Sequence, residues 1–511
     1  MELAVPQSDY DSLEDVSPLK YRSVVAMVAN SLTASFLFGF SIASINPTKD
    51  FIVIDFNWCP RDTAQPDNGL TTTCALATTY GSLITASPLI GAAFGCLVGG
   101  RLVSYGRIFS ILIMHFLFFA GNILSGLSEG VLSLVSARII LGLGLGLSTY
   151  CIPLYISEVT PNKSRGTYGV FHQLFITVGI VVANLIGLPL GSAPASTWGT
   201  SLIASDLITD FQRWWWRFSL AIPALLSIVS TILLFTIFNY DTPHFMIMKN
   251  QYSEAAALLR RINEKTDVKE EYESVNQAIQ NAKQLQSSSI SVVKAFQSSN
   301  YRHVIIIAFF LLFFQQITGI NLLITNSNNV FRSVGLDGSI LTGLSVGLTG
   351  VNVLMTLPAI FIIDRYGRRS LLIAGVFGQT VAMVAGMVAN FVDPTSQAVG
   401  IVSVFSTFLF IISFAVAYGP VPWVFLHEIF PVEIKQSVSS TATAINWVGA
   451  ILVVLPSDFY LRNGSTLMFT IFSVTNVIAL ICMFFFIRET KGRSIDDSPY
   501  FVKKAQKELK V

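Results

Sequence analysis

The chain has 511 residues, of which 52% are hydrophobic and only 12% are charged, with a formal net charge of +2 and a mean hydropathy of +0.62. Soluble domains average about 25% charged residues, so this composition excludes a soluble globular protein and predicts a polytopic membrane protein. The small net charge gives no reason to expect nucleic acid as a partner. Residues 1–18 lack the cationic segment and cleavage site of a signal peptide, so the first apolar helix is expected to direct insertion.

Apolar segments long enough to span a bilayer recur along the whole chain. A spanning helix needs about 20 mostly apolar residues, and by that rule about twelve spans are expected. The expected spans are 23–46, 78–100, 107–127, 131–153, 167–190, 215–238, 304–330, 338–363, 370–391, 398–424, 436–457 and 466–487. The fold class predicted is an all-α membrane protein with two six-helix halves.

Two polar segments interrupt the spans, at about 57–73 and 249–302, and the second reads as short surface helices between the halves. Lys and Arg concentrate in the loops on one side of the expected bundle, which the positive-inside rule assigns to the cytoplasm, together with both termini. The predicted organisation is a cytoplasmic tail (1–22), a first half (23–243), a cytoplasmic linker (244–303), a second half (304–488) and a cytoplasmic tail (489–511).

Cysteine and histidine usage points away from metal and enzyme chemistry. Cys59 and Cys74 share one polar loop, and they can form a disulfide if that loop lies outside the cell. No Cys/His cluster has metal-ligand spacing, so neither a metal nor a cofactor is expected. No nucleophile–base pair stands out, so the sequence does not predict an enzyme.

The two halves repeat the same motifs in the same order. A Gly-Arg segment with basic neighbours follows the second span of each half, at 101–107 and at 364–369. A Glu followed by Pro comes later, at 158–161 and at 428–431, and an acid-Thr pair closes each half, at 241–242 and 489–490. Duplicated halves around a midplane site are typical of secondary transporters. A duplicated channel or receptor is the less natural alternative.

All of these motifs fall on the expected cytoplasmic side, where alternating acids and bases suit ion pairs that hold one conformation shut. The positive-inside rule alone would explain the Arg residues but not the matched Glu residues. The matched acids therefore favour ion pairs that hold the cytoplasmic side closed. Arg138 lies inside a span, where a charge is costly, and Glu158 or a helix-end carbonyl is its expected partner. The predicted network is Arg107, Arg138, Glu158, Arg165, Arg365, Arg368, Glu428 and Glu489.

The stretch 315–321 places two amides, a hydroxyl, a glycine and a third amide inside a long apolar run. A buried amide without a partner costs roughly 2–7 kcal/mol, so these groups must face partner helices, a water-filled path or a polar ligand. Interhelical hydrogen bonding explains a single amide well. A cluster beside Gly319 favours a pathway for a polyhydroxylated, uncharged solute such as a sugar.

Several segments in register resemble the sugar porters of the major facilitator superfamily, the family of the glucose transporters. The resemblance covers about 38–493. Within this range, the features that most resemble the apicomplexan hexose transporters are the first loop of the chain, residues 326–328 and residues 431–435. The segments that carry it are Pro153–Arg165, Gln315–Asn321, Gly419–Trp423 and Glu489–Arg493.

The resemblance implies a hexose site built from several helices. Amides donate and accept at once, as sugar hydroxyls require, and a Trp offers a flat apolar face with one N–H donor. His172, beside one implied ligand, is expected to face away from the solute and to serve packing or local hydrogen bonding. The implied substrate-binding residues are Gln173, Gln315, Gln316, Asn321, Asn352, Trp423 and Asn446.

The resemblance also implies mobile gates. Thr325 and Asn326 stand where human-type glucose carriers have two tyrosines, and they are assigned to the outer gate, while Gly419, Pro420 and Pro422 permit a hinge. These departures from the family pattern predict a permissive site for D-glucose and other hexoses such as D-fructose.

Proton-driven relatives carry an Asp directly after Phe-Gly-aromatic in the first span, but here Ser41 follows Phe38-Gly39-Phe40. Without a titratable group in the pathway, proton binding has nothing to couple to. The expected function is therefore facilitative hexose transport in the plasma membrane, with no obligatory oligomer. The alternatives are a proton–hexose symporter and, less favoured, a sugar sensor that binds without translocating.

Overall fold

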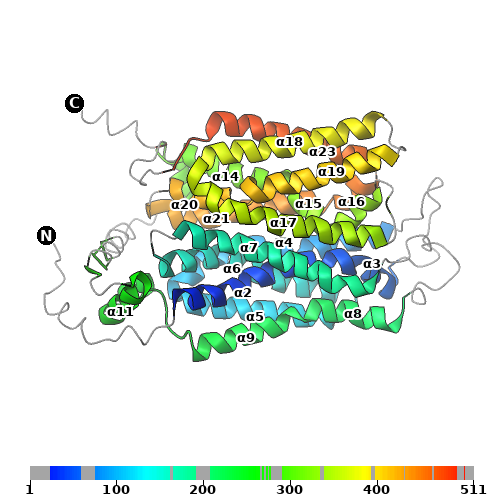
Figure 1. Ribbon diagram of the computed structural model, residues 1–511. Coiled ribbons are helices and arrows are strands. Elements are labelled where there is room, and N and C mark those ends of the chain that lie inside the picture. The colour runs from blue at the N-terminus through cyan, green and yellow to red at the C-terminus, as the bar shows by residue number, and fades with distance from the viewer. Residues whose placement is uncertain are drawn as a thin grey trace.

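The structure is a computed structural model. It describes residues 23–58, 75–161, 165–191, 208–264, 291–333, 339–392, 397–430, 432–462 and 465–491, and the individual residues 268, 269, 272, 273, 276, 277, 336 and 500. Two groups of long helices lie side by side, α2–α9 in one and α14–α23 in the other (Figure 1).

The first group forms the N-terminal half. Its helices are α2 (Val24–Ala43), α3 (Ile45–Asp55), α4 (Ala75–Leu102), η3 (Val103–Tyr105), α5 (Arg107–Gly126), α6 (Val131–Val159), α7 (Arg165–Gly187), η4 (Leu188–Leu190), α8 (Asp210–Ala221) and α9 (Pro223–Thr236). The segment after it contains α10 (Pro243–Met248), α11 (Tyr252–Asn263) and α13 (Val292–Gln297), and α11 lies beyond the end of the bundle (Figure 1).

The second group forms the C-terminal half. Its helices are α14 (Arg302–Ile317), α15 (Ile320–Thr325), α16 (Ser327–Ser333), α17 (Ser339–Tyr366), α18 (Arg368–Val392), α19 (Gln397–Ser413), the π-helix η7 (Phe414–Tyr418), α20 (Val421–Ile429), α21 (Val432–Val454), α22 (Ser457–Arg462) and α23 (Ser465–Phe486). The first span of each half is broken into pieces, as α2–α3 in one and α14–α15–α16 in the other.

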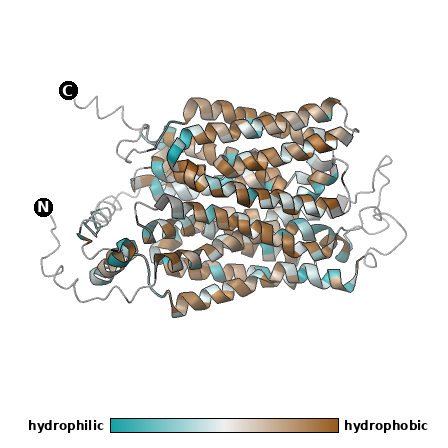
Figure 2. Ribbon diagram, in the orientation of Figure 1, coloured by the Kyte–Doolittle hydropathy of each residue, from teal (hydrophilic) through white to brown (hydrophobic). Residues whose placement is uncertain are grey.

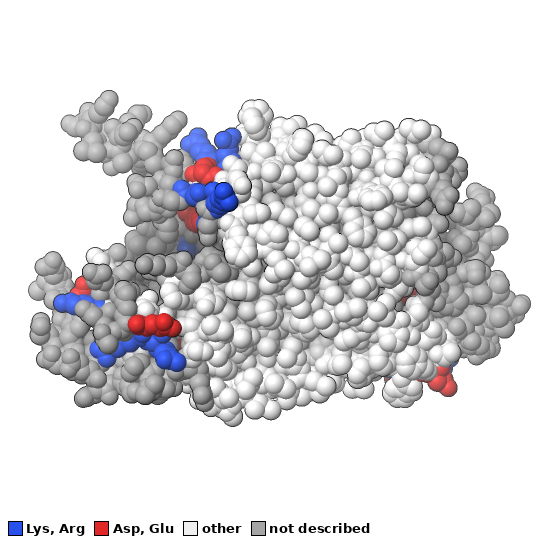
Figure 3. Space-filling view, in the orientation of Figure 1, with Lys and Arg blue, Asp and Glu red and all other residues white. Residues whose placement is uncertain are grey.

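The surface of the bundle suits a bilayer. Twelve helical segments within the described residues are long and apolar enough to cross a membrane, which agrees with the number of spans that the sequence predicts. Hydrophobic residues dominate their length (Figure 2). The visible Lys, Arg, Asp and Glu side chains gather mainly at the end of the bundle where α11 and α20 lie, and the long flank is almost free of charge (Figure 3).

Small residues let the helices of the N-terminal half approach each other at backbone contact distance. A Cβ added at Gly142 or Gly146 of α6 would clash with backbone carbonyls of α4. The same is true of Gly39 on α2, which faces the Ile176 carbonyl of α7, and of Gly179 on α7, which faces the Phe36 carbonyl of α2. Within a membrane, the close van der Waals packing that such glycines permit drives helix association, because lipid provides no hydrophobic effect between helices.

The C-terminal half is less continuous. Gly319 has φ +108°, a conformation that side chains other than glycine rarely adopt, and it separates α14 from α15. The π-helix η7 runs into Gly419 and Pro420 before α20 begins. Pro420 and Pro422 lack the N–H that a continuous helix would use, and the helix is interrupted here between η7 and α20.

Candidate functional site

A cavity of about 70 Å³ lies between the two halves. The N-terminal half contributes residues of α2, α6 and α7, and the C-terminal half contributes residues of α14, α15, α17, η7, α20 and α21. All seven residues that the resemblance implies for substrate binding line it: Gln173, Gln315, Gln316, Asn321, Asn352, Trp423 and Asn446.

Four of these amides form one hydrogen-bonded chain in the wall from the C-terminal half. Asn446 donates to Gln315 Oε1 over 2.9 Å and accepts from Gln316 Nε2 over 2.9 Å. Gln316 Oε1 in turn accepts from Asn321 Nδ2. Gln315 Nε2 donates to the carbonyls of Tyr418 and Gly419, where η7 meets the break before α20. These hydrogen bonds hold the amides in fixed orientations and connect them to the end of η7.

Asn352 on α17 completes this polar wall. It is 2% exposed, and its Oδ1 has no hydrogen-bond partner among the described residues. A buried carbonyl without a donor is costly, so this atom is a place where a ligand hydroxyl would be stabilised. The cavity therefore holds an acceptor that the protein itself does not satisfy.

Phe38 of α2, Ile176 of α7 and Phe414 of η7 line the apolar part of the cavity, and none of the three was predicted. Trp447 of α21, the neighbour of Asn446, lines it as well. Phe38 and Trp447 pack against each other from opposite halves, with ring centroids 5.6 Å apart. Nothing in the sequence distinguishes Phe38, Ile176 and Phe414 from the many apolar residues that pack between helices or face lipid.

His172 lines the cavity together with its neighbour Gln173, so the expectation that it faces away from the solute is not met. The local hydrogen bonding expected of it is found. The ring Nδ1 lies 2.7 Å from Ser35 Oγ of α2.

One end of the cavity is covered by polar contacts between the halves. Asn46 of α3 donates to Ser327 Oγ of α16 over 2.9 Å and accepts from the Asn328 backbone N–H over 3.3 Å. Lys49 Nζ donates to Asn326 Oδ1 over 3.3 Å, and Asn326 donates to Thr325 Oγ1 over 3.0 Å. Thr325 and Asn326, which the sequence assigns to the outer gate, thus lie at a seam between the halves.

Beyond this seam Asp50 of α3 forms an ion pair with Arg332 of α16, with 3.2 Å between Oδ2 and Nη1. Their side chains are 26% and 30% exposed. We call Asn46, Lys49, Asp50, Asn326, Ser327, Asn328 and Arg332 the outer seam, after the outer gate to which the sequence analysis assigns Thr325 and Asn326. Asn326 was assigned to a gate, but nothing in the sequence indicates that residues of α3 would be its partners.

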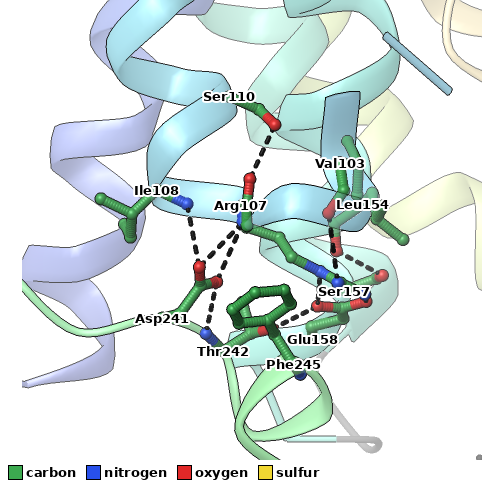
Figure 4. Close-up of polar contacts among 11 residues, drawn as sticks. Val103, Arg107, Ile108, Ser110, Leu154, Ser157, Glu158, Asp241, Thr242 and Phe245 are labelled. Atoms are coloured by element: carbon green, nitrogen blue, oxygen red, sulfur yellow. Dashed lines mark hydrogen bonds and ion pairs between the residues drawn. The ribbon is translucent and has the colours of Figure 1, made fainter. Parts of the chain in front are cut away.

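At the opposite end of the bundle, Arg107 and Glu158 form a two-point ion pair within the N-terminal half (Figure 4). The distances are 2.9 Å from Nε and 2.7 Å from Nη2, and Thr242 Oγ1 donates to the same carboxylate. Asp241 lies beneath the N-terminus of α5 and accepts from the Arg107 backbone N–H over 2.9 Å (Figure 4). A carboxylate at this position neutralises unpaired N–H groups and the positive end of the helix dipole.

The C-terminal half repeats this arrangement. Arg368 and Glu428 form an ion pair over 2.8 Å, and Thr490 Oγ1 donates to Glu428 over 2.6 Å. Glu489 takes the place of Asp241, accepting from the backbone N–H groups of Arg368 over 2.8 Å and Arg369 over 3.0 Å. The duplication that the sequence motifs indicate is therefore visible in the hydrogen bonds.

The two capping carboxylates differ in their environment. Burial raises the pKa of Asp241 above its ordinary value, although backbone N–H groups of Thr242 and Ile108 and the charge of Arg107 oppose this rise. Burial also opposes ionisation of Glu489, but backbone N–H groups of Lys491, Arg368, Arg369 and Thr490 outweigh it and lower its pKa. The pKa values of the two equivalent carboxylates are therefore shifted in opposite directions.

The remaining members of the predicted network lie elsewhere. Arg138 is 1% exposed and donates to the backbone carbonyls of Ile84 over 2.9 Å and Ser41 over 3.2 Å, so a carbonyl rather than Glu158 is its partner. Arg365 accepts a hydrogen bond from Lys491 Nζ at its carbonyl, and its guanidinium lies 5.7 Å from the Tyr366 ring centroid.

Some of the predicted residues lie in parts of the chain that the structure does not describe. The Arg165 side chain, Cys59 and Cys74 lie outside the described residues. The described ion pairs at this end, Arg107–Glu158 and Arg368–Glu428, lie within the halves rather than between them. No group of three or more His, Cys, Asp or Glu in the described part of the chain could hold a metal ion.

Comparison with known proteins agrees with this architecture. The family model described as "Sugar (and other) transporter" matches residues 26–500. Hexose transporter 1 of Toxoplasma gondii is 42% identical over 509 residues, covering 97% of this chain and 87% of the relative. Hexose transporter 1 of Plasmodium falciparum is 39% identical over 473 residues, covering 93% of this chain and 91% of the relative.

A solved structure of the proton:xylose symporter XylE bound to 6-bromo-6-deoxy-D-glucose has a TM-score of 0.75 to this structure. It is 25% identical, and the match covers 93% of this chain and 98% of that one. The twelve spans, the duplicated halves and the family-model match along almost the whole chain all indicate the same family. The chain belongs to the sugar transporter family of the major facilitator superfamily.

Proposed function

We propose that this protein is a facilitative hexose carrier of the plasma membrane, with both termini in the cytoplasm, which works by alternating access. It moves D-glucose and other hexoses such as D-fructose down their gradients. Gln173, Gln315, Gln316, Asn321, Asn352, Trp423 and Asn446 contact the sugar. The outer seam opens toward the outside, and the two Arg–Glu networks lie at the cytoplasmic end.

The observation that carries this proposal is the cavity between the halves, with amides in both of its walls. A sugar offers several hydroxyls that both donate and accept, which amides match without introducing charge. Asn352 Oδ1 is available to a hydroxyl donor. Trp423 supplies an aromatic face against which the apolar face of a pyranose can lie.

Uniport rather than proton symport is supported by the surroundings of Arg138. Its guanidinium bonds to the carbonyl of Ser41, the residue at which proton-driven relatives carry Asp. The Ser41 hydroxyl has no hydrogen-bond partner among the described residues. The residues that line the described cavity include no Asp or Glu, so a proton has no binding group there.

The decisive experiment is uptake of labelled D-glucose into proteoliposomes, with and without an imposed proton gradient and with competing D-fructose. Uptake that stops at equal concentrations under both conditions, and that fructose inhibits, supports the proposal. Accumulation driven by the gradient identifies a symporter instead, and binding without uptake identifies a sensor.

A matched pair of variants links uptake to the cavity. Gln173→Ala removes an amide from the cavity wall, whereas Gln379→Ala removes a buried amide of α18 that does not line it. We expect Gln173→Ala to raise the KM for glucose about tenfold, because a hydrogen bond in a dry site is worth roughly 1 kcal/mol or more, and Gln379→Ala to leave it near the wild-type value. Equal effects of the two variants would remove the support for this site.

A further inference from the structure

We infer that His172 is a sugar-contacting residue that presents its Nε2–H group as a donor, and that Ser35 is the positioning residue that fixes this tautomer. The inference rests on the proposed function and deepens it, because it assigns a direction to one hydrogen bond of the site. It concerns a side chain that lies beyond the set of amides described above.

His172 has only one nitrogen available to a solute. His172 lines the cavity but is only 6% exposed, and its Nδ1 is 2.7 Å from Ser35 Oγ. Since Nδ1 is occupied, Nε2 is the nitrogen that remains for a molecule in the cavity. The neighbouring Gln173 also lines the cavity.

The hydrogen bonds of Ser35 determine which nitrogen carries the proton. Serines in membrane helices commonly donate to a carbonyl three or four residues earlier, as Ser31 does to the carbonyl of Val28 over 2.8 Å. Ser35 is fully buried, and its bond to His172 is the one that the described residues provide for its hydroxyl. The hydroxyl proton therefore points to Nδ1, which acts as the acceptor, and the ring proton resides on Nε2.

The ring is neutral in this site. A second proton would place a cation in the wall of a cavity whose described lining contains no carboxylate. Thr149, Gln173, Gln315, Gln316, Asn321, Asn352 and Asn446 are the polar residues of the lining, and none of them carries a charge. His172 is consequently a donor only at Nε2, whereas an amide can present either end to a hydroxyl.

The geometry that fixes this donor is unusually rigid. One turn beyond Ser35 and His172, Gly39 of α2 meets the backbone carbonyl of Ile176 of α7 so closely that no Cβ would fit. Gly179 of α7 meets the Phe36 carbonyl of α2 in the same way. The two backbones are therefore locked together beside the Ser35–His172 bond, and the Nε2–H group keeps one direction in the cavity.

A fixed donor predicts selectivity for one sugar oxygen. A hexose that lacks the hydroxyl facing Nε2 would leave this buried N–H without a partner, and such a loss lowers affinity by about tenfold. Deletion of a hydroxyl that faces other groups is penalised independently of His172. The inference thus predicts one position on the sugar whose importance depends on this residue.

The test is competition of labelled glucose uptake by each monodeoxy analogue of D-glucose, in the wild type and in His172→Phe. Phe retains the size and planarity of the ring but has no N–H. In the wild type, one deoxy position is expected to weaken competition about tenfold. In His172→Phe, that penalty disappears while the penalties at the other positions remain. His115→Phe, at a buried histidine of α5 outside the cavity, should retain the wild-type profile.

Ser35→Ala tests the positioning role and serves if His172→Phe does not fold. Without Ser35 both tautomers become accessible, so the penalty at the same position should shrink while the penalties at the other positions remain. Ser31→Ala is its control because Ser31 bonds to a backbone carbonyl of α2. An unchanged analogue profile in His172→Phe or Ser35→Ala overturns the inference, whereas absence of wild-type uptake overturns the proposed function itself.

Discussion

Asp50 and Arg332 join the two halves at the outer edge of the seam that covers the cavity, with 3.2 Å between their charged atoms. The residues come from α3 and α16, the outer pieces of the broken first spans of the two halves. If the halves separate here to admit solute, this bond must break in every cycle. Its strength therefore contributes to the equilibrium between the closed and open seam.

Neutralising the pair should favour the open seam. Partly exposed ion pairs contribute about 0–1 kcal/mol, so Asp50→Asn or Arg332→Gln should increase opening by up to about fivefold. The measurement is the rate at which a cysteine introduced at Thr149, in the cavity wall, reacts with an impermeant thiol reagent from outside.

The charge-reversed double variant, Asp50→Arg with Arg332→Asp, should restore slow labelling. Asp55→Asn is the matched control because Asp55 pairs with Arg217 inside the N-terminal half. Identical labelling of wild type and Asp50→Asn would show that the pair does not hold the seam.

Ser41→Asp should create proton dependence. The new carboxylate would lie beside Arg138, whose guanidinium already contacts the Ser41 backbone, and a charge pair in a low-dielectric interior responds strongly to protonation. We expect uptake by this variant to become pH-dependent and to accumulate glucose under an imposed proton gradient. Ser41→Asn is the isosteric control and should remain insensitive to the gradient.

Glu158→Gln should destabilise the protein much more than Thr242→Val. Arg107 and Glu158 are only 8% and 10% exposed, and removing one partner of a buried ion pair typically costs about 3–5 kcal/mol. Loss of the threonine hydrogen bond costs about 1 kcal/mol. Thermal unfolding in detergent measures both variants, and a smaller effect of Glu158→Gln than of Thr242→Val would contradict this assignment.

Asp241 and Glu489 should give opposite pH dependences of stability. The pKa of Glu489 is lowered by folding, so its contribution is present above its unfolded-state pKa of about 4.3 and is lost as the pH falls through the folded-state value. The pKa of Asp241 is raised, so its contribution is present below about 3.9 and is lost as the pH rises through the folded-state value.

Melting temperatures of Glu489→Gln and Asp241→Asn, each compared with the wild type across the acid range, test this. The deficit of Glu489→Gln should shrink as the pH falls. That of Asp241→Asn should shrink as the pH rises. Parallel profiles for the two variants would show that the capping sites are electrostatically equivalent.

The sequence was sufficient to predict the spans and the duplication, because bilayer thickness imposes a length of about 20 apolar residues that any window reveals. The family resemblance placed Gln315, Gln316 and Asn321 in one site, and all three line the cavity. The partner of each amide could not be predicted, because Asn446 and Gln315 are 131 positions apart.

The outer seam and the His172 position could not be read from the sequence for a different reason. Lys49 and Asp50 look like loop charges at the end of a span, but the chain continues as α3 and carries them against α16. The direction of His172 depends on how α2 packs on α7. Arg138 finds its acceptors only in the folded state, where Ile84 and Ser41 approach it from two other helices.

The glycine contacts that lock α2 to α7 have a mechanical consequence. The wall from the N-terminal half is rigid, whereas the wall from the C-terminal half contains helix interruptions at Gly319 and between η7 and α20. Conformational change is easiest where helices are interrupted, so α14–α16 and α20 should move when a sugar binds. The N-terminal half would then stay fixed, and the C-terminal half would close around the sugar.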